Sequence, residues 1–223
     1  MSLPRRPAAV IFDMDGLLFD TVALHEEAAG LAARDVALKM TPEIFRSLVG
    51  LPGPAGKARL LQHFGPSFPI DIFFEARRGH FYAMVDTRLV LKPGVLELLD
   101  TLDALGLPRA IATSSSHKTV RHHLSFHDLG ARFHHVVAQG DYTAGKPAPD
   151  PYLTAAKRLG VAPGLCLALE DSHNGVRSAS AAGMMTIMVP DLLEATDEIR
   201  GLCTIVVRDL HAVRNLVLSR TPR

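Results

Sequence analysis

Apolar positions along the chain form short uninterrupted runs, and stretches with helical spacing separate most of them. The runs are continuous rather than alternating, which is typical of strands buried on both faces of a parallel sheet. They cover residues 8–12, 109–113, 135–138, 165–169, 186–189 and 204–207. Helical spacing occupies residues 95–105, 118–126, 150–159, 174–182 and 209–218. This alternation predicts an α/β fold, a Rossmann-like parallel sheet with helices on both faces.

One interval breaks this alternation. Residues 21–91 contain no clear strand pattern, and Pro and Gly separate several helical patterns within them. The helical patterns cover residues 22–34, 42–49, 57–63 and 70–85. The interval is too long for a single crossover between two parallel strands. We therefore predict a core domain of residues 1–20 and 92–223, with an α-helical domain of residues 21–91 inserted into it.

Composition narrows the classes of partner. The chain has 223 residues, of which 24 are Lys or Arg and 23 are Asp or Glu, so no excess charge attracts nucleic acid or an anionic membrane. Aromatic residues are 6% of the chain and Trp is absent, which disfavours stacking on single strands. We expect a cytoplasmic monomer that binds neither nucleic acid nor membrane, because the sequence has no signal-peptide pattern, no membrane-length apolar run and no sign of an obligate interface. Cys166 and Cys203 lie in apolar runs and are expected to be buried, reduced thiols.

Polar residues gather where the predicted strands end, and ligands of open parallel sheets bind at those ends. They are Asp13 and Asp15, then Thr113–Ser116, then Lys146, and finally Glu170 and Asp171. Four acids on one rim repel one another unless a cation neutralises them, and oxygen ligands without His or Cys suit Mg²⁺. A lysine and a hydroxyl beside such a cation suit a phosphate group. A carboxylate held there could attack phosphorus and form an aspartyl-phosphate.

Each of these motifs also has a simpler interpretation. An Asp-x-Asp pair is common in turns, Thr113–Ser116 and Ser172 could cap helices, and Lys146 could be solvated. For all of these interpretations to hold, the motifs would have to fall at successive strand ends by chance. The set as a whole therefore favours a catalytic site.

The same residues carry a resemblance to a known family. Segments 13–21 (DMDGLLFDT), 113–115 (TSS), 145–150 (GKPAPD) and 169–172 (LEDS) resemble the haloacid dehalogenase-like hydrolase superfamily. The helical insertion resembles the subgroup that has a helical cap domain after the first strand. Within that subgroup the chain is similar to the β-phosphoglucomutase and small-metabolite phosphatase branch, over nearly its whole length.

The resemblance implies chemical roles. Asp13 would be the nucleophile, Asp15 the general acid and then the general base, and Lys146 a residue that screens nucleophile and phosphate. Dehalogenases of this superfamily lack an acid two residues after the nucleophile, so Asp15 favours phosphoryl transfer. The resemblance also implies phosphate binding by Thr113, Ser114 and Lys146, and Mg²⁺ binding by Asp13, Asp15 through its backbone carbonyl, Asp171, and Glu170 through water.

In the helical domain, the resemblance points to His25 and Gly50 as residues near the substrate, and Lys57 is one of several basic residues there that could contact the leaving group. His25 stands twelve residues after Asp13, as a hinge histidine of the mutase branch does, but a helix histidine without chemistry fits equally well. Lys57 could simply be solvated. The mutase pattern has basic residues around the glycine that Gly50 matches, and the stretch 48–54 has none. This departure favours a hydrolase over a mutase.

The remaining histidines are weaker candidates. We expect the adjacent pairs His122–His123 and His134–His135 to be solvated or at helix ends, because neighbouring side chains point in different directions. His173 follows the Glu170–Asp171 pair and could reach substrate or face solvent.

The sequence thus predicts a Mg²⁺-dependent phosphatase that hydrolyses a small phosphorylated metabolite, with a sugar phosphate as the first expectation. A β-phosphoglucomutase-like sugar phosphomutase would use the same aspartyl-phosphate. A non-catalytic binding protein on this fold is a third hypothesis, which the complete set of acids disfavours.

Overall fold

A computed structural model describes residues 2–49, 51 and 53–220. The chain divides into two compact units. The core unit comprises Met1–Phe19 and Leu91–Arg223, and the helical unit comprises Asp20–Val90. Each is described by itself below.

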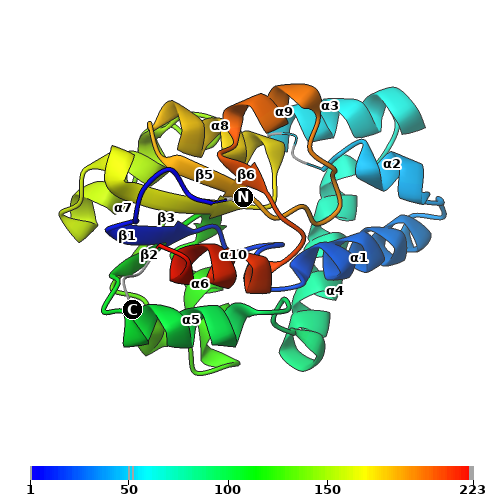
Figure 1. The fold of residues 1–223 in the computed structure, drawn as a ribbon. Coiled ribbons are helices and arrows are strands. Elements are labelled where there is room, and N and C mark those ends of the chain that lie inside the picture. The colour runs from blue at the N-terminus through cyan, green and yellow to red at the C-terminus, as the bar shows by residue number, and fades with distance from the viewer. Residues whose placement is uncertain (1, 50, 52, 221–223) are drawn as a thin grey trace. The chain divides into compact units, whose positions relative to one another are not determined.

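The core unit is built on one parallel sheet (Figure 1). Its strands are β1 Ala9–Phe12, β2 Arg109–Ser116, β3 His135–Gln139, β4 Cys166–Glu170, β5 Met185–Met188 and β6 Ile205–Val206. Among the described residues these six strands pair in the order β3-β2-β1-β4-β5-β6, and every pair is parallel. The strand order reverses direction between β1 and β4, the point at which ligands bind in open α/β sheets.

Helices cover both faces of this sheet (Figure 1), which confirms the predicted α/β fold. They are α5 Val95–Ala104, α6 His117–Ser125, α7 Asp150–Leu159, α8 His173–Ala181, α9 Asp197–Leu202 and α10 Leu210–Leu218. Short 3₁₀ turns, η1 and η2, lie at Gly130–Arg132 and Pro163–Leu165. Ala9 and Ile11 of β1 pack in one cluster with Tyr152 of α7 and Ala179 of α8. Side chains alternate along a strand, so the next residues of β1 face the opposite layer, where α5 packs on α10.

The helical unit contains α1 Thr21–Asp35, α2 Pro42–Arg46, α3 Gly53–Phe64 and α4 Ile70–Arg88. The two longest helices, α1 and α4, pack along each other. Small residues of α1, including Ala28 and Ala32, and larger ones of α4, including Phe73 and Val85, are buried. None of the helices that the structure describes is both long and apolar enough to cross a bilayer.

Two helices differ most from the sequence prediction, while α2 ends three residues earlier and α4 three residues later than predicted. Helix α3 begins at Gly53 rather than at residue 57, because Pro54 needs no amide partner in a first helical turn. Helix α9 was not predicted, since its six residues are too few to show a period. It is fixed locally by Thr196, whose side chain accepts a hydrogen bond from the amide of Ile199. Cys166 and Cys203 are both free thiols, and Cys166 is buried while Cys203 is partly buried.

Candidate active site

Asp13 stands directly after β1, at the centre of the sheet edge. Its amide donates to the carbonyl of Leu169 at 3.0 Å, which ties the end of β1 to β4. The side chain is 11% exposed. Gly16, three residues on, has φ of +85° and its amide donates to the carbonyl of Phe19 at 2.9 Å. A residue with a side chain is strained at this φ, so glycine permits the tight turn that follows the acid.

The hydroxyl cluster Thr113–Ser116 lies within the end of β2. The sequence had suggested instead that most of it follows the strand. The pairing of β2 with β3 shifts in register between Ala112 and Ser116, so the strand extends past the predicted end with an irregular ladder. Thr113 is buried, and its hydroxyl accepts a hydrogen bond from the amide of Ser115 at 3.1 Å. Ser114 is exposed. The Ser115 hydroxyl donates to Oδ2 of Asp15 at 2.7 Å.

Lys146 joins two acids that come from different strands. Its ammonium group donates to Oδ1 of Asp13 and, at 2.6 Å, to Oε1 of Glu170. The Lys146 side chain is only 7% exposed and lies 5.1 Å from the ring centroid of Tyr152. The Tyr152 hydroxyl donates to the same Oε1 at 2.7 Å. Lys146, Tyr152 and the two acids therefore form one buried, hydrogen-bonded cluster.

Glu170 is fully buried at the end of β4 and is held from several sides. Its Oε2 accepts from the amide of Asp171 at 3.2 Å and from the Ser172 hydroxyl at 3.1 Å. The first turn of α8 closes over this carboxylate at Gly175, where a Cβ atom would lie 1.9 Å from the Glu170 carboxyl carbon. Only glycine leaves room for the acid at this point.

Replacing Gly175 with Ala is expected to destabilise the core unit by about 1–3 kcal/mol, because the methyl group overlaps a buried carboxylate. Urea denaturation would measure this loss. Gly79→Ala in α4 is the matched control, since nothing lies within 4 Å of the added methyl group. There alanine should stabilise the helix by up to about 1 kcal/mol. Equal stability of the Gly175→Ala and wild-type proteins would contradict this packing.

The acids at this edge of the sheet destabilise one another's charges. Burial raises the pKa of Asp13 to about 7; Lys146 lowers this pKa and the neighbouring Glu170 raises it. Burial, and then the charges of Asp13 and Glu170, hold the pKa of Asp171 well above its ordinary value. Burial by itself would lower the pKa of Lys146, but the two acids more than offset it and raise that pKa. Lys146 alone therefore does not offset the burial and mutual repulsion that raise the pKa values of Asp13 and Asp171.

Such a centre suits a divalent cation. One carboxylate oxygen from each of Asp13, Glu170 and Asp171 lies within 4.8 Å of the others, and all three residues are buried. Hard oxygen donors without histidine or thiolate fit Mg²⁺, and a second positive charge would relieve the repulsion that raises their pKa values. The residues therefore fit the metal that the sequence predicts.

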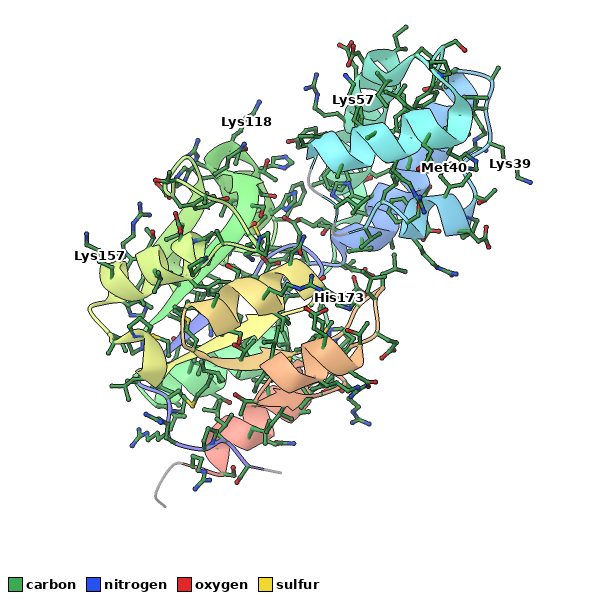
Figure 2. The ribbon with its side chains drawn as sticks, turned by 90° about the horizontal axis from the view of Figure 1, so that it is seen from above. Lys39, Met40, Lys57, Lys118, Lys157 and His173 are labelled. Carbon is green, nitrogen blue, oxygen red and sulfur yellow. The ribbon has the colours of Figure 1, made fainter. Side chains whose placement is uncertain are left out.

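The three candidates from residues 21–91 lie in the helical unit or outside the described residues. The His25 ring of α1 is stacked on Phe81 of α4, with centroids 3.8 Å apart and planes at 6°. Lys57 lies on α3 (Figure 2). Its ammonium group lies 2.9 Å from Oδ1 of Asp71. Gly50 lies outside the described residues.

The histidines of the core unit differ among themselves. His134 and His135 are exposed and His122 is partly buried. His123 lies in the last turn of α6, as one of the two expected roles has it, but it is fully buried, so the solvated alternative is wrong. Its ring lies edge-on to Phe19 at 5.6 Å, and its Nδ1 is 3.8 Å from Oδ1 of Asp15. The cause is its position on the buried side of α6, which it shares with Thr119 and Val120. His173, at the start of α8 (Figure 2), lies 2.8 Å from the carbonyl of Glu194 through its Nε2.

Sequence reasoning missed Ser115, Tyr152 and His123 as neighbours of the acids. Tyr152 falls in an ordinary helical pattern and His123 in a histidine pair, and neither pattern signals a contact with a distant carboxylate. Ser115 was noted only as part of a hydroxyl cluster. The missing information is the direction in which each side chain points.

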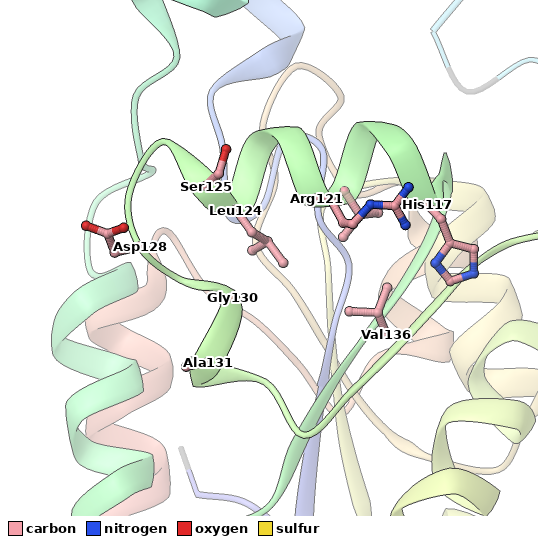
Figure 3. Close-up of a pocket in the computed structure, with 9 residues that line it drawn as sticks. His117, Arg121, Leu124, Ser125, Asp128, Gly130, Ala131 and Val136 are labelled. Carbon is pink, nitrogen blue, oxygen red and sulfur yellow. The ribbon is translucent and has the colours of Figure 1, made fainter.

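A separate hollow of about 500 Å³ lies between α6 and β3 (Figure 3). His117 and Arg121 of α6, Val136 of β3 and Asp128 of the following loop line it (Figure 3). None of its lining residues is one of the acids described above. The hollow is therefore a separate feature and not part of the acidic centre.

The fold and the site together define an α/β enzyme with an acidic, metal-compatible centre at the middle of its sheet. Residues 7–183 match the family model described as haloacid dehalogenase-like hydrolase, and the chain belongs to this family of hydrolases.

Individual relatives agree with that assignment. The chain is 34% identical to the plasmid protein CbbY of Cupriavidus necator over 86% of this chain and 82% of that protein. It is 31% identical to the phosphorylated carbohydrates phosphatase of Thermotoga maritima, over 80% of this chain and 83% of that protein. A crystal structure of a putative beta-phosphoglucomutase from Thermotoga maritima superposes with a TM-score of 0.80 and 27% identity, covering 96% of this chain and 99% of the other.

Proposed function

We propose that this protein is a Mg²⁺-dependent phosphatase that hydrolyses small phosphorylated metabolites through an aspartyl-phosphate. The observation that carries the proposal is the buried cluster of Asp13, Lys146, Glu170 and Asp171, with a further acid, Asp15, two residues after the first. Hydrolase relatives with phosphatase names support it.

The reaction divides into two steps. A carboxylate oxygen of Asp13 attacks phosphorus, the ester P–O bond breaks, and Asp15 gives its proton to the leaving oxygen. Asp15, now ionised, takes a proton from a water molecule that attacks the phosphorus of the aspartyl-phosphate. The P–O bond to Asp13 breaks, inorganic phosphate leaves, and both acids return to their starting state.

The groups that would hold the metal and the phosphate come from four strand ends. Asp13, Asp171, the backbone carbonyl of Asp15 and, through water, Glu170 would hold Mg²⁺, which when bound neutralises phosphate charge and orients it for attack. Three further groups would bind the phosphate oxygens: the Thr113 hydroxyl, the Ser114 amide and the Lys146 ammonium group.

The helical unit is proposed as a cap domain that selects the substrate and excludes water during the first step. His25, Gly50 and Lys57 would be its substrate-facing residues. A sugar phosphate is the first substrate class, because the two relatives above whose names carry a substrate concern phosphorylated carbohydrates and phosphoglucose. The structural relative named as a mutase keeps a sugar phosphomutase as the second candidate.

The proposal is tested by measuring phosphate release from 4-nitrophenyl phosphate and from a panel of sugar phosphates, with Mg²⁺ and with a chelator. We expect turnover of several substrates that falls at least about 100-fold on removal of the metal, since charge neutralisation at phosphorus is lost. A phosphomutase would instead interconvert sugar phosphate isomers and be activated by a sugar bisphosphate. Absence of both activities in the presence of Mg²⁺ would overturn the proposal.

A further inference from the structure

A feature of the core unit that the proposed reaction does not use is the contact of Asp15 with Ser115, at the end of β2, and with His123, on α6. Oδ2 of Asp15 accepts a hydrogen bond from the Ser115 hydroxyl at 2.7 Å. Oδ1 of the same carboxylate lies 3.8 Å from Nδ1 of His123. Both oxygens of the acid are thus flanked by one segment, a hundred residues away along the chain.

The partners of Asp15 are themselves fixed. The Ser115 amide donates to the Thr113 hydroxyl at 3.1 Å, which anchors the serine to the buried end of β2. His123 is fully buried and packs edge-on against Phe19. A carboxylate with a hydrogen bond at one oxygen and a fixed ring near the other has few alternative rotamers.

We infer that Ser115 is a positioning residue that holds the side chain of Asp15 in the orientation needed for proton transfer, with His123 limiting its movement on the other side. This inference rests on the proposed function, in which Asp15 protonates the leaving group. The core unit would then pre-orient its own acid, and Thr113 would link phosphate binding to acid placement through Ser115.

Positioning of an acid has a specific kinetic consequence. An alkoxide leaving group, as in a sugar phosphate, needs a proton to depart, whereas 4-nitrophenolate leaves without one. A misplaced Asp15 therefore slows the first step for a sugar phosphate and hardly affects it for the aryl ester. Because kcat/KM reports on events up to the first irreversible step, it separates the two substrates.

The experiment compares the wild type with Ser115→Ala, Ser115→Thr and Ser116→Ala. Ser116 is the matched control, because its hydroxyl contacts Thr119 at the start of α6 and none of the acids. We expect Ser115→Ala to lower kcat/KM for a sugar phosphate about tenfold or more, as partial loss of general acid catalysis, and to change kcat/KM for 4-nitrophenyl phosphate by less than about twofold. Ser115→Thr, which keeps the hydroxyl, should restore most of the loss, and Ser116→Ala should match the wild type.

An equal fall with both substrates would mean that Ser115 binds the phosphate group itself, and would overturn the inference. Crystal structures of the wild type and of Ser115→Ala, both without substrate, give a second readout that needs no activity. We expect the Asp15 carboxylate to turn or to occupy two conformers when the hydroxyl is removed. An unmoved carboxylate would overturn the inference even if the wild type proved inactive, whereas an inactive wild type with a displaced carboxylate would fail only the proposed function.

Discussion

The Asp13→Asn protein is expected to lose turnover almost completely, with kcat at least about 10⁴-fold below the wild type, because an amide cannot form the aspartyl-phosphate. Asparagine keeps the shape of the side chain, so the fold should persist and the loss should be chemical. Release of phosphate from 4-nitrophenyl phosphate would measure it. Beryllium trifluoride, an analogue of the phosphoryl group, should bind the wild type and not this variant.

Asp100→Asn is the matched control for this experiment. Asp100 lies in the same unit, but its side chain is 72% exposed and its partner is Arg132 on the surface, at 2.8 Å. Its loss should leave kcat within about twofold of the wild type, as exposed ion pairs contribute little. Wild-type turnover by Asp13→Asn would remove Asp13 from the reaction and with it the proposed mechanism.

The Lys146→Met protein is expected to be both inactive and markedly less stable. Removing the Lys146 ammonium group leaves Asp13 and Glu170 buried without their shared cation. In comparable buried pairs, the loss of one partner lowers the free energy of unfolding by about 3–5 kcal/mol. Turnover should fall about 10³-fold, because the charge of the transferring group loses a partner. Urea denaturation and phosphate release would measure the two effects.

The stability loss should depend on pH in a defined direction. The pKa of Asp13 is raised to about 7 in the fold, chiefly by burial, so between about pH 4 and pH 7 the folded state holds a proton that the unfolded chain has lost. Stability therefore decreases as pH rises through this window. Lys146 lowers this pKa, so without it the window extends above pH 7. The deficit of Lys146→Met should accordingly be larger at pH 8 than at pH 5, in metal-free buffer.

Lys157→Met serves as its control. Lys157 projects from α7 and is exposed (Figure 2), so its replacement should change stability by less than about 0.5 kcal/mol at either pH. A deficit of Lys146→Met that is the same at pH 5 and pH 8 would show that its role is packing and not charge.

The sequence predicts most of the core because its strands are unusually easy to recognise. Runs such as Ala9–Phe12 and Cys166–Glu170 are apolar throughout, and this is what burial on both faces demands. Once a parallel sheet is inferred, the rule that its strand ends share one edge brings Asp13, Glu170 and Asp171 together without coordinates. The structure does place these three acids within reach of a single ion.

The contacts around those acids could not be predicted in the same way. The hydrogen bond from Tyr152 to Glu170 depends on which side of α7 faces the sheet, and the buried position of His123 depends on the rotation of α6. Ser115 reaches Asp15 only because β2 continues past its predicted end with a shifted register. Such details are set by packing between distant elements, and the local pattern of residues does not encode them.

The backbone bridge between Phe19 and Leu91 has a consequence for the evolution of this chain's sequence. These residues bound the inserted segment, and they pair as antiparallel neighbours within the core unit. The core thus holds together the ends of a 71-residue insertion, Asp20–Val90, and the loop-closure cost of doing so grows only slowly with the insertion's length, by about 0.6 kcal/mol for each doubling. Its length and sequence can therefore diverge at little cost to the strands that carry the acids, and under the proposed cap role a change of substrate would need changes in this one module only.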